Sequence, residues 1–463
     1  MRRPLALTGP LGAVLALVAT LVALQMRPAG SVSPPTMSTV AVTAAPSTSS
    51  STSTSTSTST STSTSTSTTT STTTTTLAPA PPGFVDAVRG ALADPRFEAA
   101  TVGMAVWVEG AGMVLNHNAD LPMRPGSNEK LLVAWGAYGV LGPGATLDTE
   151  VRAEGEVDGS VLRGNLFLAG GGDPTLSSAG RHSVDRLAAL VRQRGITEVT
   201  GDLVVDDSRF DDNRRAPGWT ERHVPLFVGP LSALAVDGNW VRTDPEYVAN
   251  PAVGNLGVLR AALMRHGVTV AGGERMGTAP DAAPVVASVH SAPVADLVRH
   301  MLTTSDNFYA EMLLKEVGRR ALGRGTLENG VAAVRDLAAG AGVQLTGRAA
   351  DGSGLSRDNS RPAREWTELL VAARDQPWFD HLFGGLPIAG RTGTLANRFL
   401  GTSGEANVRA KTGSVRESRA LSGYVTTAGG RQVVFSLVVN GALPPAVIPA
   451  IDNVVASIAA SPT

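Results

Sequence analysis

Cysteine is absent from the 463 residues of the chain, which excludes disulfide bonds, thiolate zinc sites and thiol catalysis. The seven histidines are scattered, and no two of them have the spacing of a helical metal site. We therefore expect no metal centre built on histidine. The formal net charge is only −1, so the composition does not indicate a basic surface for nucleic acid.

Lysine is almost absent as well. The 39 basic residues include three lysines, Lys130, Lys315 and Lys411. Arginine is used wherever a generic positive charge suffices, so each remaining lysine indicates a place that needs a compact ammonium able to lose its proton. Two of the three lie in the motifs described below.

The first 83 residues read as targeting and spacer sequence. Arg2 and Arg3 precede an apolar run, Leu11–Leu24, in the layout of a secretory signal. With Pro4–Leu7 the segment reaches the roughly 20 residues that span a bilayer, so residues 1–30 are a cleaved signal peptide or an uncleaved membrane anchor. Residues 31–83 are rich in Ser, Thr and Pro, a composition that predicts a disordered linker.

The remaining chain predicts an α+β fold. Residues 84–94 have a helical pattern, and strand patterns make one hairpin near each end of this region, at 102–116 and 421–440, with a final helix at 446–459. Hairpins from both ends predict one antiparallel sheet, with a helical region from the middle of the chain.

Residues 142–290 have a different pattern from the flanking sequence. Short strands at 164–168 and 201–206 and a helix at 183–194 alternate with turns rich in Gly, Asp and Pro. We expect one or more inserted subdomains here. Residues 84–141 and 291–463 would then form a single catalytic domain around them.

Three short motifs carry the candidate chemistry. Ser127–Lys130 (SNEK) precedes an apolar helical stretch, Ser305–Asn307 (SDN) lies between two helical runs, and Lys411–Gly413 (KTG) lies in a strand-like segment. Positions i and i+3 share one face of a helix, so Lys130 is expected beside Ser127. A serine hydroxyl is a weak nucleophile until a neighbouring base removes its proton, and a buried ammonium next to a second cation loses its own proton more easily.

The other motifs supply the remaining parts of an acyl transfer. Ser305 is expected to pass a proton to a leaving amine, and Asn307 to hold a substrate amide. Lys411–Gly413 on an edge strand would bind an extended peptide, with Lys411 or Thr412 meeting a terminal carboxylate. Backbone N–H groups, including that of Ser414, would stabilise the oxyanion.

Each motif also has a purely structural interpretation. Ser127 can be a helix cap with solvated neighbours, and Ser305–Asn307 can be a capping turn. Lys411 can be a charged residue that prevents an edge strand from pairing with another chain. We favour the catalytic interpretation because the three together match the parts of one reaction. Arg391–Thr394 (RTGT) imitates the third motif, but no strand–turn–strand pattern follows it, so we expect a loop there.

The motif set S-x-x-K, S-D-N and K-T-G is typical of class A β-lactamases and penicillin-binding proteins. Over roughly residues 84–445 the chain resembles the low-molecular-weight penicillin-binding proteins of class C, D-alanyl-D-alanine carboxypeptidases/endopeptidases with an inserted region. Further stretches that carry the resemblance are LAGGGDPTL at 168–176, DGSGLSRDN at 351–359, GRTGTLANR at 390–398 and RAKTGSV at 409–415. The family's usual threonine after the third motif is Ser414 here.

The resemblance implies a specific activity. Ser127 would be the acylated nucleophile, Lys130 its general base, Ser305 and Asn307 the second-motif pair, and Lys411–Ser414 the substrate-binding strand. The substrate would be a peptidoglycan peptide, β-lactams would be covalent inhibitors, and no cofactor or nucleic acid would take part. The enzyme would act outside the cytoplasm, secreted or anchored to the membrane. A β-lactamase and a catalytically silent wall-binding protein are the alternatives.

Overall fold

The computed structural model describes residues 83–240 and 244–462. The predicted signal or anchor, and the linker up to residue 82, lie outside the described residues. Within the described ranges, no helix combines the length and the apolar character needed to cross a bilayer.

Both ends of the described chain contribute to a five-stranded sheet with the order β10-β11-β12-β1-β2. All neighbouring strands are antiparallel, and β1 pairs with β12 in a register that places Met104 opposite Leu437. The strands are β1 (Ala100–Val108), β2 (Gly112–His117), β10 (Arg409–Val415), β11 (Ser418–Thr426) and β12 (Gln432–Gly441). The predicted α+β fold, with one sheet from both chain ends, is confirmed.

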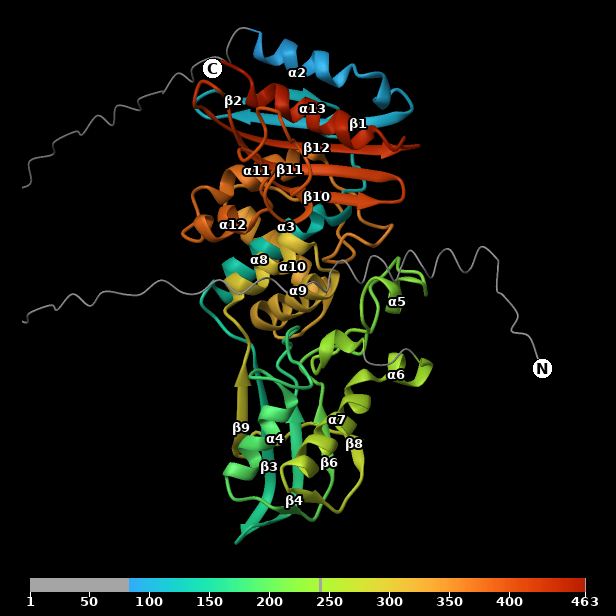
Figure 1. Cartoon of the computed structure of the whole chain (residues 1–463), viewed down its shortest axis with the longest axis vertical. Coiled ribbons are helices and arrows are strands. Elements are labelled where there is room, and N and C mark those ends of the chain that lie inside the picture. Colours follow the sequence, from blue (N-terminus) through green and yellow to red (C-terminus); the bar gives the residue numbers. More distant parts are fainter. Residues whose placement is uncertain (1–82, 241–243, 463) are drawn as a thin grey trace, which may run out of the picture. The chain divides into compact units, whose positions relative to one another are not determined.

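Helices cover both faces of this sheet because its central strand is apolar on both sides. Alternate residues of β12 point to opposite faces. Phe435 and Leu437 pack into the core formed with the first and last helices, α2 (Phe84–Leu92) and α13 (Val447–Ala459). Val434 and Val438 pack on the other face, into the core of the helical region. Figure 1 shows α2 and α13 side by side over one face of the sheet.

The helical region is organised around α3 (Lys130–Gly136), all of whose residues are buried. A helix that is apolar all round must be enclosed by other elements, and α3 contacts α8, α9 and α10. The surrounding helices are α8 (Val294–Thr304), α9 (Asn307–Leu322), α10 (Leu327–Gly340), α11 (Ala363–Ala373) and α12 (Phe379–Gly385). Shorter turns are the 3₁₀ helices η1 (Pro95–Phe97), η2 (Gly126–Glu129) and η5 (Gly393–Leu395), and the π-helix η3 (Ala137–Leu141).

Residues 142–290 contain a second sheet of seven strands, in which antiparallel and parallel pairs are mixed. It has its own apolar core, to which α4 (Val184–Gln193) and α7 (Pro251–Arg265) contribute. The strands are β3 (Asp148–Asp158), β4 (Val161–Ala169), β5 (Glu198–Val199), β6 (Leu203–Asp206), β7 (Thr269–Val270), β8 (Glu274–Met276) and β9 (Val285–His290). The short helices are α5 (His223–Leu226), η4 (Asp237–Asn239) and α6 (Pro245–Ala249).

The central position of β12 generates a stability prediction. Leu437 is fully buried, whereas Leu400 is 58% exposed in a loop. We expect Leu437→Ala to lower the free energy of unfolding by about 2–5 kcal/mol, because it leaves a cavity in the core. The matched Leu400→Ala change should cost less than about 0.5 kcal/mol. Urea unfolding followed by circular dichroism measures both, and equal losses would contradict this account of the core.

Candidate active site

Ser127 lies in the 3₁₀ turn η2, which leads directly into α3. A Cβ on Gly126, which has a φ of +54°, would lie 3.2 Å from the Ser414 nitrogen, so η2 is held closely against β10. Asn128 donates to the Ser422 hydroxyl on β11 at 2.6 Å, and Glu129 is also fully buried. The interpretation of SNEK as a cap with solvated neighbours is therefore wrong, because Glu129 and Lys130 are both fully buried.

Lys130 is fully buried, and its amine lies within hydrogen-bond distance of three oxygens. The Nζ atom is 3.1 Å from Ser127 Oγ, 2.9 Å from Asn307 Oδ1 and 2.7 Å from the Ser353 carbonyl oxygen. Burial lowers the pKa of this amine to about 8, while the nearby Glu311 carboxylate opposes that change. Burial and a neighbouring cation were both expected to lower this pKa. Burial is the main cause, and the charges that act on the Lys130 amine are carboxylates that raise its pKa.

The second motif is a tight turn between α8 and α9. It caps α9 and also brings two side chains into contact with the buried lysines. Asp306 caps α9 by accepting from the Tyr309 N–H at 3.0 Å, as the capping interpretation predicted. Ser305 ends α8 in the left-handed conformation, with a φ of 63°. A non-glycine residue there is held by its surroundings at a cost of about 1–3 kcal/mol. This turn lets Ser305 and Asn307 contact Lys411 and Lys130, respectively.

The third motif lies on β10, at the edge of the five-stranded sheet. Lys411 is fully buried and donates to Ser305 Oγ at 2.9 Å and to the Thr412 carbonyl at 2.8 Å. Burial, followed by the charge of Lys130, holds the pKa of Lys411 well below its usual range. The Thr412 hydroxyl donates to Thr394 Oγ1 at 2.8 Å.

The three motifs therefore converge. One hydrogen-bonded group joins Ser127, Lys130 and Asn307, and a second joins Ser305 and Lys411. The two groups are electrostatic neighbours, since the charge of Lys130 acts on Lys411. Gly413 and Ser414 lie directly against η2. As expected, RTGT is a loop, in which Arg391 is exposed and Thr394 reaches Thr412.

Four residues near these motifs had no role in the sequence argument. Ser353 and Thr394 belong to stretches that carried the family resemblance, but the pattern alone gave them no chemistry. Glu311 follows Asn307 by one helical turn, a spacing that could have drawn attention to it. The backbone carbonyl of Phe227 accepts a hydrogen bond from Asn307 Nδ2 at 3.0 Å. Because the contact does not involve the Phe227 side chain, the residue type could not have indicated it. Both ends of the Asn307 amide are thus occupied by protein partners.

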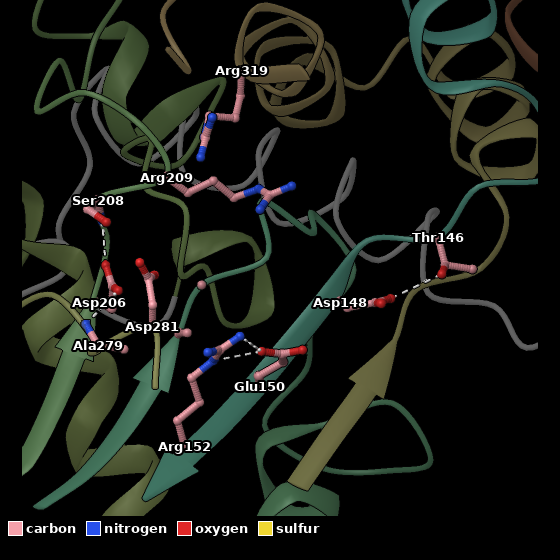
Figure 2. Close-up of a pocket in the computed structure, with 12 residues that line it drawn as sticks. Thr146, Asp148, Glu150, Arg152, Asp206, Ser208, Arg209, Ala279, Asp281 and Arg319 are labelled. Carbon is pink, nitrogen blue, oxygen red and sulfur yellow. Dashed lines mark hydrogen bonds and ion pairs between the residues drawn. The ribbon is translucent and has the colours of Figure 1, made fainter. Parts of the chain in front are cut away.

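Residues 142–290 also form a separate cavity, of about 400 Å³, with the end of α9. Figure 2 shows Arg209 and Arg319 on one side of it, and an ion pair between Arg152 and Glu150 on the other. None of the motif residues line it. Arg319 lies twelve residues after Asn307, about 18 Å along the helix axis, so this cavity is distinct from the converging motifs.

An α+β domain with helices on both faces of its sheet, and with a serine, two buried lysines and an SDN turn converging at the edge strand, defines a penicillin-binding type of serine enzyme. The chain belongs to the D-Ala-D-Ala carboxypeptidase 3 (S13) family, whose sequence model matches residues 84–252 and 245–461.

Known proteins with similar sequence and structure agree with this family. The chain is 31% identical to the D-alanyl-D-alanine carboxypeptidase of Actinomadura sp. over 81% of its length and 84% of the relative's. It is 35% identical to carboxypeptidase DacB of Mycolicibacterium smegmatis over 79% and 82%. The fold matches crystalline penicillin binding protein 4 of Haemophilus influenzae with a TM-score of 0.71 and 23% identity, covering 76% of this chain and 93% of the other.

The close approach of Gly354 to η2 generates a second prediction. A Cβ there would lie 1.9 Å from the Gly126 carbonyl oxygen, whereas nothing lies within 4 Å of one on Gly323. Both glycines have a positive φ, of +84° and +78°, so alanine meets similar backbone strain at each, about 1–2 kcal/mol. We expect Gly354→Ala to lower the free energy of unfolding by about 1–3 kcal/mol more than Gly323→Ala, because of the steric clash. Equal losses in urea unfolding would contradict the clash.

Proposed function

We propose that the chain is a serine D-alanyl-D-alanine carboxypeptidase in which Ser127 is acylated by a peptidoglycan peptide and Lys130 is the general base. The observation that carries this proposal is the environment of the Lys130 amine. Two of its three neighbours, Asn307 Oδ1 and the Ser353 carbonyl, are oxygens that can only accept hydrogen bonds. A neutral amine donates its two N–H groups to these oxygens, and its lone pair then faces the Ser127 hydroxyl.

Acylation follows from this arrangement. Ser127 Oγ attacks the carbonyl carbon of the penultimate D-alanine while its proton moves to Lys130 Nζ. The N–H groups of Ser127 and Ser414 stabilise the developing oxyanion, which the packing of Gly126 against the Ser414 nitrogen supports. The C–N bond then breaks and leaves an ester on Ser127.

The departing amine needs a proton, and Ser305 is placed to deliver it. Its hydroxyl accepts a hydrogen bond from Lys411, so a proton lost by Ser305 is replaced from that amine. Lys411 and Thr412 face the terminal carboxylate of the substrate, whose negative charge favours the protonated form of Lys411. Free D-alanine leaves. Water then adds to the ester carbonyl carbon and the C–O bond to Ser127 breaks; Ser127 Oγ regains its proton from Lys130, and the proton released by the water replaces the one that Lys411 gave up.

The substrate peptide would bind along β10. This strand is at the edge of its sheet, so an extended peptide can add to it through backbone hydrogen bonds. In this proposal residues 84–141 and 291–463 form the catalytic domain, and residues 142–290 are inserted subdomains that reach it at Phe227. The enzyme acts on the cell-wall side of the membrane, and β-lactams acylate the same serine.

The nucleophile is tested with fluorescent penicillin and with muropeptides. Ser127→Ala should abolish the covalent label, and the unmodified chain should shorten pentapeptide stems by one D-alanine, as read by mass spectrometry. The exposed Ser403→Ala is the matched control and should keep both activities. Undiminished labelling of Ser127→Ala would overturn the assignment. Rapid penicillin turnover without an adduct would favour a β-lactamase, and no adduct with retained peptidoglycan binding would favour a silent binding protein.

The pKa of Lys130 predicts the pH dependence of acylation. Burial lowers this pKa to about 8, so the reactive neutral amine becomes scarce as the pH falls below that value. The second-order rate constant for acylation by penicillin should rise about tenfold per pH unit below pH 8 and level off above it. Stopped-flow measurements between pH 6 and 10 test this. A rate that does not change across this range would contradict Lys130 as the base.

A further inference from the structure

The stretch DGSGLSRDN at 351–359 contributes to the site through its backbone. Its Ser353 carbonyl is one of the two oxygens that orient the amine of Lys130. A carbonyl can orient an amine only if its own peptide group is fixed. Asp351, Ser353, Ser356 and Asn359 are all fully or almost fully buried, so this loop is part of the interior. The question is which groups hold it.

Two carboxylates hold three consecutive peptide groups of the loop. Glu311 accepts from the Gly352 N–H at 3.0 Å and from the Ser353 N–H at 2.8 Å, using one oxygen for each. Asp351 accepts from the Gly354 N–H, at 2.8 Å, which belongs to the same peptide group as the Ser353 carbonyl. The orientation of that carbonyl is therefore determined on both sides.

Glu311 is placed for this contact by the helix that also carries Asn307. The two residues are four positions apart on α9 and share one face of it. Asn307 touches Lys130 directly, and Glu311 reaches it through the loop. Both acceptors of the Lys130 amine thus depend on one rigid helix. A shift of either residue would turn the amine lone pair away from Ser127.

Burying the carboxylate of Glu311 in the protein interior lowers the stability of the fold. Its side chain is fully buried, and burial together with the nearby Asp351 raises its pKa to about 8. Among the described residues it forms no salt bridge within 4.0 Å, and it is stabilised by hydrogen bonds from the Gly352 and Ser353 N–H groups and from the Ser353 side chain. Isolated buried charges are disfavoured by several kcal/mol, and apolar replacements of buried ionic groups are often stabilising. A structural role alone does not account for an ionisable residue here.

We propose that Glu311 is a positioning residue of the catalytic centre, whose carboxylate fixes the Ser353 carbonyl and thereby aims the Lys130 amine at Ser127. This inference rests on the proposed function, since it assigns Lys130 the role of base. Glu311 does not touch the substrate or the reacting atoms. It acts through the loop and through its negative charge.

The charge of Glu311 gives the proposal a signature that packing alone would not produce. The groups that act on Lys130 are Glu129 from η2, Asp306 before α9, Glu311 itself, and Asp351 from the loop, with Lys411 opposite on β10. Glu311 is the largest of the charges that raise the pKa of Lys130. Where Glu311 is ionised, near and above its own pKa of about 8, removing its charge lowers the pKa of Lys130 further, so the neutral amine persists to lower pH. The acidic limb of the acylation profile then moves to lower pH.

The first experiment compares acylation by fluorescent penicillin from pH 5.5 to 10 in the full chain and in Glu311→Gln. The amide keeps the size of the side chain but removes its charge, and its NH₂ group opposes one of the two N–H donors. We expect acylation at the optimum to fall about tenfold to a hundredfold, a part of the 10²–10⁴ that a positioned base contributes. The pH below which acylation slows should move to a lower value, because the charge that raises the pKa of Lys130 is gone.

Glu316→Gln is the matched control. Glu316 is also buried on α9 but pairs with Arg209, away from the motifs. This variant should change the acylation rate less than twofold, and the pH below which acylation slows should stay the same. If Glu311→Gln keeps the wild-type rate, or loses activity equally at every pH, Glu311 has no positioning role. If the unmodified chain is not acylated at Ser127, the proposed function fails instead.

The scarcity of lysine allows a direct second measurement. Labelling the three lysines with ¹³C at Cε gives three sets of signals, which Lys315→Arg helps to assign. The titration midpoint of Lys130 should be lower in Glu311→Gln than in the wild type, and an unchanged midpoint would overturn the proposal. If Glu311→Gln does not fold, Glu311→Asp keeps the charge but shortens the reach. It should slow acylation with the midpoint near its wild-type value, and acylation at the wild-type rate would overturn the proposal.

Discussion

The amine of Lys130 lies among three oxygens from distant parts of the chain, out of contact with solvent. Burial makes the neutral form accessible near pH 8, because water no longer stabilises the ammonium. The same burial requires each of the three oxygens to be held in place, since a buried amine with a missing partner would be strongly destabilised. The arrangement of η2, α9 and the loop at 351–359 can be understood as meeting this one requirement.

Around this amine the protein keeps several ionisable groups that a stability optimum would exclude. Glu129 and Glu311 are fully buried, and burial raises the pKa of each to about 8. Arg361, also fully buried, lies 4.0 Å from Glu129 and is held by Glu365 at 2.6 Å. Ser305 adds a left-handed backbone at the α8–α9 turn. Strain and buried charge collected in one place are typical of functional sites, where the rest of the fold offsets their cost.

Helix α9 connects this centre with residues 142–290. Its first residue, Asn307, contacts Phe227, and further along Lys315 pairs with Asp211 and Glu316 with Arg209. Trp219 donates to Asp351 at 2.8 Å, so the region also reaches the loop that orients Lys130. Residues 142–290 are thus in contact with Asn307 and with the loop that carries Ser353, two of the groups around the Lys130 amine.

Features that depend on short spacings along the chain could be predicted from the amino-acid pattern. Alternating apolar residues in 102–108 and the apolar hairpin that includes 433–440 predicted strands. The spacing of Ser127 and Lys130 placed both on one helical face, and the rarity of lysine marked Lys130 and Lys411. The 11-residue strand β3 was not anticipated, since its charged, glycine-containing sequence lacks a clear apolar alternation. The partners of Lys130, the extent of its burial and the place of Glu311 became visible only in the folded chain. Burial and backbone hydrogen bonds between residues as distant as 130 and 353 arise from long-range packing, which no local pattern encodes.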